Sequence, residues 1–278
     1  MPVNNSENLR DKAAVVTGGA QGIGEACALA LAQEGASVSI LDLDLAAAED
    51  VAKRICATGG QAFATHVDVS DPASVDRAFE AHVARLDRID VVVNCAGICW
   101  KKPVVELEDD EWKQMLSINL DGTFYVARAA ARVMERQKAG TIILISSGQG
   151  ITGEAGFGAY AASKGGVGRL GEVLAEELGP SGITVNVVNP GLTFTRLSRD
   201  TFKTEQDWRA IAARSTLPRL GRPADVAHLV VFLAGPGSTF MSGQHITTRG
   251  RSPGQLQGPN DWVFDEARAL GAELPEGV

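Results

Sequence analysis

The chain has 278 residues, 45% of them hydrophobic, and a formal net charge of −8. This length suits one large α/β domain or two small ones, and the apolar share is sufficient for an extensive core. The acidic balance argues against nucleic-acid or membrane partners, no apolar run is long enough to span a bilayer, and the polar residues 1–11 do not resemble a signal peptide.

The first predicted element is an apolar strand, residues 12–17, followed by a glycine-rich turn and an alanine-rich helix over residues 25–34. Gly18, Gly22 and Gly24 allow positive φ and close backbone approach, and the helix N-terminus offers free N–H groups to a pyrophosphate. Strand, turn and helix in this order are typical of the first unit of a dinucleotide-binding fold. An ordinary tight turn is the alternative.

The second predicted strand, residues 37–41, ends at Asp42, within the offset expected for the carboxylate that binds an adenosine ribose. A carboxylate there accepts hydrogen bonds from the ribose hydroxyls and repels a 2′-phosphate. Leu43 follows rather than arginine, and Gln21 fills the turn where a basic residue would meet that phosphate. We therefore expect NAD rather than NADP. Asp42 or Asp44 could also cap the next helix.

Further strands alternate with helices along the rest of the chain, and they are predicted over residues 61–67, 89–93, 141–145, 184–188 and 245–248. This alternation demands right-handed crossovers, so the fold class is α/β, a single doubly wound parallel sheet with helices on both faces. In such sheets the ligand binds beyond the carboxyl ends of the strands. Five segments end there in residues suited to a site: Gly18, Asp42, Asp68, Asn94 and Ser147.

Two later segments depart from regular patterns. A long helix predicted over residues 108–136 is interrupted at 119–122 by residues that are poor helix formers, so we expect a kink or local disturbance there. Residues 193–214 have no clean apolar stripe and are interpreted as a mobile excursion over the site. This excursion carries four cations, which could also be a solvated helix face: Arg196, Arg199, Lys203 and Arg209.

A hydroxyl, a tyrosine and a lysine follow the strand at 141–145. Ser147 lies just beyond that strand, and Tyr160 and Lys164, four residues apart, share one face of the next predicted helix. A nearby ammonium group would lower the pKa of the phenol, and Ser147 could donate a hydrogen bond to a carbonyl or alkoxide oxygen. Tyrosine and lysine at this spacing are common by chance, so the interpretation depends on the rest of the chain.

The four cysteines, at positions 27, 56, 95 and 99, form no CxxC motif and have no histidines at metal-ligand spacing. We expect no metal site, and reduced thiols acting as small apolar residues in a cytoplasmic protein. The histidines also fall outside all motifs and are predicted to be structural or on the surface: His66, His82, His228 and His245.

The sequence resembles the short-chain dehydrogenase/reductase family in its compact, single-domain Rossmann form, over roughly residues 9–248. The matching stretches, by spacing as well as identity, are Thr17–Gly24, Asp68-Val69, Asn94–Gly97, Asn119, Ser147, Tyr160–Lys164 and Asn189–Gly191. The resemblance implies a catalytic tetrad of Asn119, Ser147, Tyr160 and Lys164. Tyr160 would be the general acid/base, Ser147 would hold the substrate oxygen, Lys164 would bind the nicotinamide ribose, and the backbone carbonyl of Asn119 would hold a proton-relay water.

The resemblance also implies the residues that hold the cofactor, NAD. They are Gly18, Gln21, Gly22, Ile23, Gly24, Asp42, Asp68, Val69, Asn94, Ala96, Gly97, Tyr160, Lys164, Pro190, Thr193 and Thr195. If the family geometry holds, the substrate contacts Ser147 and a second set of residues: Cys99, Trp100, Gln149, Glu154, Phe157 and Leu192. Two of these, Gln149 and Glu154, are polar and favour a hydroxylated substrate. Cys99 is interpreted as a pocket wall, with a redox switch as the alternative.

The end of the chain departs from the family. Where an acidic residue and two glycines are usual, this chain continues from Thr248 through Arg249 to residue 278. We assign residues 1–250 to one dinucleotide-binding and catalytic domain and residues 251–278 to an extension. The extension could cap the active site of its own or a neighbouring subunit, with Trp262 and Phe264 as anchors, or be a disordered end.

Three functions remain open from the sequence. The favoured one is an NAD-dependent dehydrogenase of a secondary alcohol, such as a sugar, polyol or cyclic alcohol, acting as a homotetramer, the common state of the family. The second is a 3-oxoacyl thioester reductase, whose anionic carrier would suit the cations of residues 193–214, although Asp42 argues against the NADPH that such reductases use. The third is a nucleotide-sensing regulatory protein on the same fold.

Overall fold

The structure is a computed structural model, and it describes residues 9–212, 217 and 219–250. The strands are β1 (Ala13–Thr17), β2 (Ser37–Asp42), β3 (Gln61–His66), β4 (Val91–Asn94), β5 (Gly140–Ile145), β6 (Ile183–Pro190) and β7 (His245–Thr248). The helices are α1 (Gly22–Gln33), α2 (Leu45–Ala57), α3 (Pro72–Leu86), α4 (Asp109–Leu116), α5 (Gly122–Gln137), α6 (Gly158–Leu178), α7 (Arg196–Thr201), α8 (Glu205–Ala212) and α9 (Pro223–Ala234).

The strands form one parallel, seven-stranded sheet in the order β3-β2-β1-β4-β5-β6-β7. The order reverses between β1 and β4, as in a doubly wound sheet, and the crevice for a ligand opens at such a reversal. The predicted α/β fold class is confirmed. The predicted extension, residues 251–278, lies outside the described residues, so the division of the chain at residue 250 and both alternatives for the extension stay predictions.

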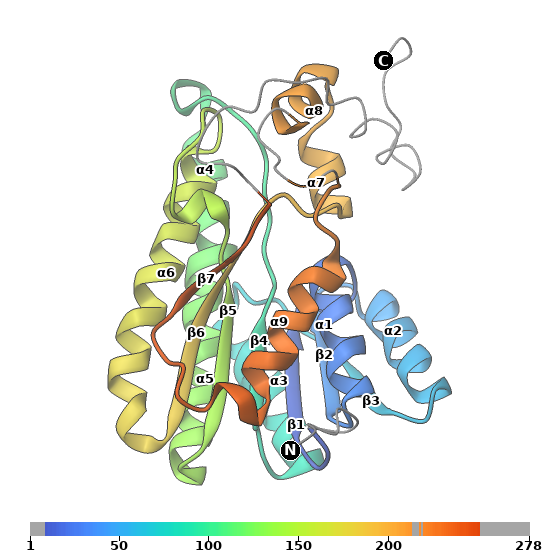
Figure 1. Ribbon diagram of the computed structural model, residues 1–278. Helices are drawn as coiled ribbons and strands as arrows, with labels where there is room; N and C mark the ends of the chain where they lie inside the picture. The colour runs from blue at the N-terminus through green and yellow to red at the C-terminus, as the bar shows by residue number, and fades with distance from the viewer. Residues whose placement is uncertain (1–8, 213–216, 218, 251–278) are drawn as a thin grey trace.

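Alternate residues of the buried strands pack into two separate cores, one on each face of the sheet. In β1, Ala14 and Val16 belong to the core beneath α1, α2 and α9, whereas Val15 belongs to the core beneath α3, α5 and α6. Figure 1 shows α9 packed beside α1 on the first face, although the two helices lie at opposite ends of the chain. Strands buried on both faces explain the continuous apolar runs in the sequence.

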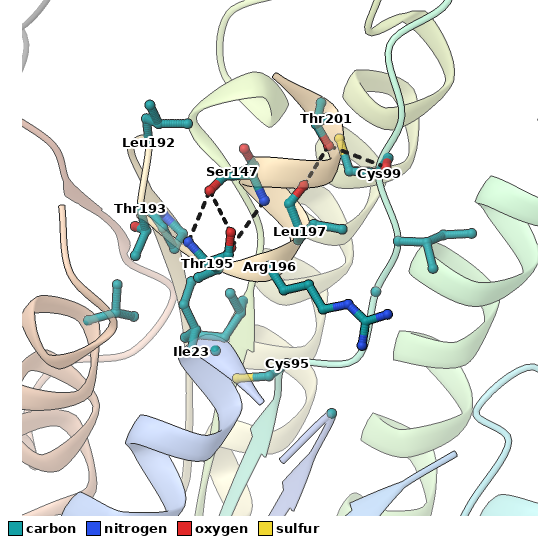
Figure 2. A pocket seen from close by; sticks show the side chains of 18 of the residues that line it. Ile23, Cys95, Cys99, Ser147, Leu192, Thr193, Thr195, Arg196, Leu197 and Thr201 are labelled. Atoms are coloured by element: carbon teal, nitrogen blue, oxygen red, sulfur yellow. Dashed lines mark hydrogen bonds between the residues drawn. The ribbon is translucent and has the colours of Figure 1, made fainter. Parts of the chain in front are cut away.

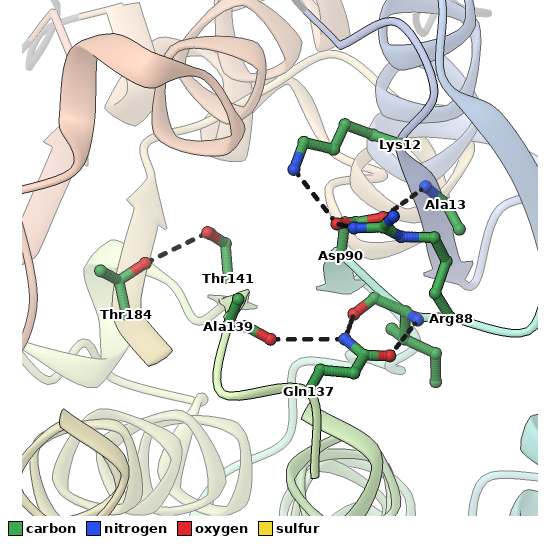
Figure 3. Close-up of polar contacts among 9 residues, drawn as sticks. Lys12, Ala13, Arg88, Asp90, Gln137, Ala139, Thr141 and Thr184 are labelled. Carbon is green, nitrogen blue, oxygen red and sulfur yellow. Dashed lines mark hydrogen bonds and ion pairs between the residues drawn. The ribbon is translucent and has the colours of Figure 1, made fainter. Parts of the chain in front are cut away.

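The amino edge of the sheet is closed by a cluster around Asp90. Its carboxylate accepts two hydrogen bonds from Arg88 (2.6 and 2.7 Å), one from the Ala13 amide (2.9 Å) and one from Lys12 (3.2 Å) (Figure 3). Burial alone would raise the pKa of Asp90, but these donors outweigh it and hold the pKa below its usual value. The charged side chains Lys12, Arg88 and Asp90 of this edge are therefore paired with one another.

The excursion predicted over residues 193–214 contains two short helices, which the sequence analysis did not predict. Helices α7 and α8 lie above the carboxyl ends of the strands (Figure 1), and we call residues 196–212 the lid. Thr195 caps α7 by accepting a hydrogen bond from the Ser198 amide (3.2 Å), and Trp208 of α8 is only 2% exposed. The two large apolar residues of α8, Trp208 and Ile211, fall within only eight residues, so no clean apolar stripe was visible in the sequence.

Candidate active site

A large cavity, about 1290 Å³ in volume, lies beyond the carboxyl ends of the strands, and we call it the main cavity. Its walls come from the glycine-rich turn, from the segments after β2, β4, β5 and β6, and from the lid. Figure 2 shows Ile23 and Cys95 at one end of this cavity and Cys99 and Thr201 at the other. The main cavity therefore joins the predicted dinucleotide site to the predicted substrate site in a single crevice.

Most of the predicted site residues line the main cavity. From the predicted cofactor set these are Gly18, Gln21, Gly22, Ile23, Gly24, Asp42, Asp68, Val69, Ala96, Gly97, Tyr160, Lys164, Pro190, Thr193 and Thr195. From the predicted substrate set they are Cys99, Ser147, Gln149, Glu154, Phe157 and Leu192. Three predicted residues, Asn94, Trp100 and Asn119, do not line it.

The glycine-rich turn fits the backbone of a dinucleotide. A Cβ atom on Gly18 would lie 2.8 Å from the Ala96 backbone, one on Gly24 would lie 2.1 Å from the Gly18 carbonyl oxygen, and Gly18 and Gly22 have φ of 62° and 60°. These positions therefore exclude side chains. The residue before α1, Gln21, makes no side-chain cap, so the N–H groups of the helix N-terminus remain available to a phosphate.

Asp42 ends β2 at the far end of the same cavity. Its two carboxylate oxygens accept hydrogen bonds from the amides of Ala20 and Asp44, both at 3.0 Å, which fix the carboxylate beside the glycine-rich turn. Each oxygen retains a further lone pair for a ribose hydroxyl. The cap of α2 is Asp44, which accepts from the Ala47 amide at 3.0 Å, so of the two candidate caps the structure selects Asp44.

Ser147, Tyr160 and Lys164 meet in the main cavity between β5 and α6. The oxygen of Ser147 accepts from the Gln149 amide (3.1 Å), and its hydroxyl lies near enough to the phenol of Tyr160 to lower the pKa of that phenol. The ammonium of Lys164 donates to the Ile145 carbonyl oxygen (2.9 Å) and lies 6.0 Å from the centroid of the Tyr160 ring. A substrate oxygen placed between the two hydroxyls would meet a donor and a proton-transfer group together.

Burial controls the charges of this group. It lowers the pKa of Lys164 to about 8, so the ammonium form still dominates at neutral pH. Burial also raises the pKa of Tyr160 well above its ordinary value, with the neighbouring Cys99 adding to the rise and the Ser147 hydroxyl opposing it. In the protein alone burial therefore outweighs any lowering by Lys164, because the phenolate form is poorly solvated at this depth, and the role expected of Lys164 stays a prediction.

Asn119 lies behind the main cavity and holds its wall. It is fully buried in a π-helical turn, Ser117–Asp121, which confirms the predicted disturbance of the long helix. Its side chain pairs with the backbone of Ile98, accepting from the amide (2.8 Å) and donating to the carbonyl oxygen (2.9 Å). A Cβ atom on Gly97 would meet the Asn119 amide oxygen at 3.0 Å and the Lys164 nitrogen at 3.4 Å, so Asn119 lies close to the lysine.

Asn94, predicted to contact the cofactor, is instead 2% exposed and belongs to a buried hydrogen-bond chain. Thr17 donates to its amide oxygen (2.7 Å), its amide nitrogen donates to Thr123 (2.8 Å), and Thr123 donates to the backbone carbonyl of Asn119 (2.7 Å). The backbone carbonyl of Asn119, which is expected to hold a relay water, thus already accepts a hydrogen bond from Thr123. The sequence did not single out Thr123, although its place four residues after Asn119 in a helical pattern puts the two within reach.

The substrate end of the main cavity is mixed in character. Gln149 donates to Glu154 at 2.9 Å, so these two polar residues are partly matched to each other. Phe157 is 2% exposed and lines the wall, and burial raises the pKa of the Cys99 thiol to about 12, which favours a pocket wall over a redox switch. Trp100 has a buried indole nitrogen without a hydrogen-bond partner among the described residues, away from the cavity wall.

The lid supplies wall residues that sequence reasoning did not select. Leu197, Thr201, Phe202, Asp207 and Ile211 all line the main cavity. No local pattern marks them, because their helices are short and the residues face the cavity only through the packing of the lid. Among the described residues no group of histidine, cysteine, aspartate and glutamate is arranged to hold a metal ion, and none of their helices is long and apolar enough to cross a membrane.

Comparison with known proteins gives consistent matches over nearly the whole described chain. A family model described as "Enoyl-(Acyl carrier protein) reductase" matches residues 18–250. Cyclopentanol dehydrogenase of Comamonas testosteroni is 34% identical over 242 residues, covering 87% of this chain and 97% of that protein. The 3-oxoacyl-[acyl-carrier-protein] reductase FabG of Salmonella typhimurium is 36% identical over 245 residues, covering 87% and 98%.

Solved structures agree with the fold. Levodione reductase superimposes with a TM-score of 0.83 at 28% identity, covering 87% of this chain and 97% of that one. A short-chain type dehydrogenase/reductase from Mycobacterium ulcerans superimposes with a TM-score of 0.84 at 31% identity, covering 94% and 99%. The similarity thus extends over the cavity as well as the sheet.

Proposed function

Because the chain belongs to the short-chain dehydrogenase/reductase family, and so is an oxidoreductase, we propose that it interconverts a secondary alcohol and its ketone with NAD as cofactor. The observation that carries the proposal is that Ser147, Tyr160 and Lys164 line the same cavity as the glycine-rich turn and Asp42. A hydride acceptor bound along that turn would therefore reach a substrate held by the two hydroxyls.

The choice of NAD rests on Asp42. Its carboxylate would accept hydrogen bonds from ribose hydroxyls and repel a 2′-phosphate. The neighbouring Leu43 is 66% exposed and apolar, and the turn contains Gln21 in place of a basic residue. The residues that would hold the rest of the dinucleotide are the glycines of the turn, Asp68 and Val69, and the segment from Pro190 to Thr195.

Ser147, Tyr160 and Lys164 have different roles in the proposed proton transfer. Ser147 donates a hydrogen bond to the substrate oxygen, and Tyr160 takes a proton from the alcohol or gives one to the ketone. Bound NAD⁺ would supply the hydride acceptor and a positive charge near the phenol. Lys164 adds a second positive charge and is held in place by the Ile145 carbonyl oxygen. In the direction of reduction, the raised pKa of Tyr160 keeps the phenol protonated and ready to donate.

For the substrate we propose a hydroxylated or cyclic secondary alcohol, such as a sugar, polyol or cyclic alcohol. The polar pair Gln149–Glu154 beside the apolar Phe157 supports an alcohol that has both a ring or chain and a second polar group. The relative named cyclopentanol dehydrogenase supports the cyclic class. A 3-oxoacyl thioester is the second candidate, supported by the relatives named 3-oxoacyl-[acyl-carrier-protein] reductase. Asp42 argues against it.

We also propose a cytoplasmic homotetramer. Exposed apolar side chains on α5 and α6, Phe124 (42%) and Val173 (52%), support contacts between subunits through these helices. All four cysteines are free thiols, which supports a reducing compartment. Light scattering on the full chain should give four chain masses.

A reduction screen tests the activity. Purified protein is mixed with NAD⁺ or NADP⁺ and with sugars, cyclic alcohols, steroids or 3-hydroxyacyl thioesters, and reduced cofactor is followed by its absorbance. We expect turnover with NAD⁺ on a polyol or cyclic alcohol. A clear NADP⁺ preference would overturn the argument from Asp42, and turnover confined to thioesters would select the second candidate. No turnover with any of these compounds, together with tight dinucleotide binding, would favour a nucleotide sensor.

A further inference from the structure

We propose that Lys101 is a positioning residue, which fixes the substrate wall of the main cavity by joining the loop before α6 to the lid. This inference rests on the proposed function, because it concerns the substrate end of the same cavity. Lys101 follows β4 and lines the cavity together with its partner Asp207, which lies on α8. Three sets of contacts support the assignment.

The first set fixes the stem of the lysine on the loop before α6. A Cβ atom on Gly156 would lie 2.8 Å from the Cγ atom of Lys101, so the absence of a side chain at Gly156 makes room for this stem. Gly156 has φ of 86°, and its carbonyl oxygen accepts from the amide of Lys102 (2.8 Å). The stem of Lys101 therefore packs directly against the residue that precedes Phe157.

The second set fixes the head of the lysine on the lid. The ammonium of Lys101 forms an ion pair with the Asp207 carboxylate, whose side chain is only 11% exposed. The other oxygen of Asp207 accepts from the hydroxyl (2.7 Å) and amide (3.2 Å) of Thr204, at the start of α8. These donors outweigh the effect of burial and hold the pKa of Asp207 below its usual value. The lid is also joined to the segment after β4 by a hydrogen bond from the Thr201 hydroxyl to the Cys99 carbonyl oxygen (3.5 Å).

The third set of contacts connects the Lys101–Asp207 pair to Tyr160 through a row of aromatic rings. Trp208, next to Asp207, packs edge-on against Phe202 with ring centroids 6.2 Å apart. Phe202 packs against Phe157 at 5.9 Å, and Phe157 packs against Tyr160 at 6.4 Å. Phe157 and Phe202 line the cavity. Lys101 thus contacts the residues that precede two members of this aromatic wall, Gly156 before Phe157 and Asp207 before Trp208.

This arrangement predicts which kinetic constant depends on Lys101. The adenosine end of the cavity, at Asp42, shares no contact with the lysine, so cofactor affinity should not change. Loss of the ion pair should let the lid and the aromatic wall take several positions. Substrate binding then weakens, and the Michaelis constant for substrate rises by about threefold to tenfold, the range open to a partly exposed coupled pair.

The kinetic test uses Lys101→Met, which keeps the apolar stem and removes the charge. The matched control is Lys102→Met, because Lys102 also has an ion pair, with Glu111 at 2.6 Å, but neither residue lines the cavity. We expect only Lys101→Met to raise the Michaelis constant for substrate, with the constant for NAD⁺ unchanged, and Lys101→Arg, which keeps an apolar stem and the charge, to avoid much of the loss. Equal effects in the two methionine variants would overturn the proposal.

A second readout does not depend on turnover. Hydrogen–deuterium exchange of peptides from residues 196–212 should become faster in Lys101→Met and stay unchanged in Lys102→Met. Protected lid peptides in Lys101→Met would overturn the positioning role. Faster exchange without activity on any alcohol would support the positioning role while the proposed function fails, so the two failures are distinguishable.

Discussion

At the scale of single residues, depth in the protein determines the chemistry of the site. Tyr160 and Lys164 are both displaced toward their neutral forms by burial, although the ammonium form of Lys164 still dominates at neutral pH. Two single substitutions separate the role of the Tyr160 phenol from that of the Asp42 carboxylate, which is proposed to bind the ribose.

Tyr160→Phe should remove the proton-transfer group and keep the ring in place. We expect turnover to fall by about 10²- to 10⁴-fold, the usual contribution of a general acid or base, while NAD affinity is retained. Tyr125→Phe is the matched control, because Tyr125 is the other tyrosine of the chain and lies on α5, outside the cavity wall. Steady-state rates and a dinucleotide titration measure both; full turnover in Tyr160→Phe would contradict the assignment.

Asp42→Asn should alter the choice of cofactor. The substitution removes the charge that repels a 2′-phosphate and weakens a charged hydrogen bond to ribose, so kcat/KM with NAD⁺ should fall by roughly 10- to 100-fold while that with NADP⁺ rises. Asp44→Asn changes the neighbouring carboxylate, which caps α2, and should keep the wild-type ratio. An unchanged ratio in Asp42→Asn would show that the carboxylate only orders the turn.

At the scale of elements, the π-helical turn between α4 and α5 depends on a buried polar chain. Thr123 is 1% exposed, accepts from Asn94 and donates to the Asn119 carbonyl oxygen. The turn leaves backbone groups outside the regular helical pattern, and such groups need other partners when buried. A hydroxyl at position 123 supplies one, so the wall behind Lys164 and Gly97 keeps a single shape.

Thr123→Val tests this support, because valine matches threonine in shape and lacks the hydroxyl. Two buried polar groups then lose a partner, and we expect the free energy of unfolding to fall by about 1–3 kcal/mol. Thr123→Ser retains the hydroxyl and should retain more of the stability. Denaturant unfolding of both variants makes the comparison, and a valine variant as stable as the serine variant would contradict this account.

At the scale of the whole molecule, a buried histidine links stability to pH. His82 of α3 is 1% exposed; its Nε2–H donates to the Arg88 carbonyl oxygen (2.9 Å), so Nδ1 accepts from the Ser39 hydroxyl on β2. Burial lowers the pKa of His82 below its ordinary value, with the bond to the Arg88 carbonyl opposing the shift. The folded protein therefore prefers neutral His82, and protonation favours unfolding.

This preference predicts acid sensitivity in a defined window. Since the pKa is lower in the folded than in the unfolded chain, the contribution of His82 is complete above the unfolded pKa of about 6.5 and is lost as pH falls below it, by at most about 1.4 kcal/mol per pH unit. Melting temperatures between pH 7 and pH 5 should therefore fall less in His82→Gln than in the wild type. His66→Gln, at an exposed position, should behave as the wild type. Equal slopes in all three would contradict the assignment.

The sequence by itself determined the sheet, its helices and the edge where the ligand site lies. Apolar runs, glycines and helix starts are local signals, and the carboxyl ends of parallel strands must meet at one edge, so Gly18, Asp42, Ser147 and Tyr160 could be brought together without coordinates. The disturbance at residues 119–122 was visible for the same reason, because poor helix formers act locally.

Only the tertiary structure decided how the site is supported. Lys101 pairs with Asp207 of the lid, and hydrogen bonds join Thr17 to Asn94 and Asn94 to Thr123. These contacts join residues that are far apart in sequence, and no local pattern specifies them. The same holds for the pKa of Tyr160: sequence spacing shows a lysine one turn away, but burial depends on the packing of every surrounding element, and burial proved the larger effect.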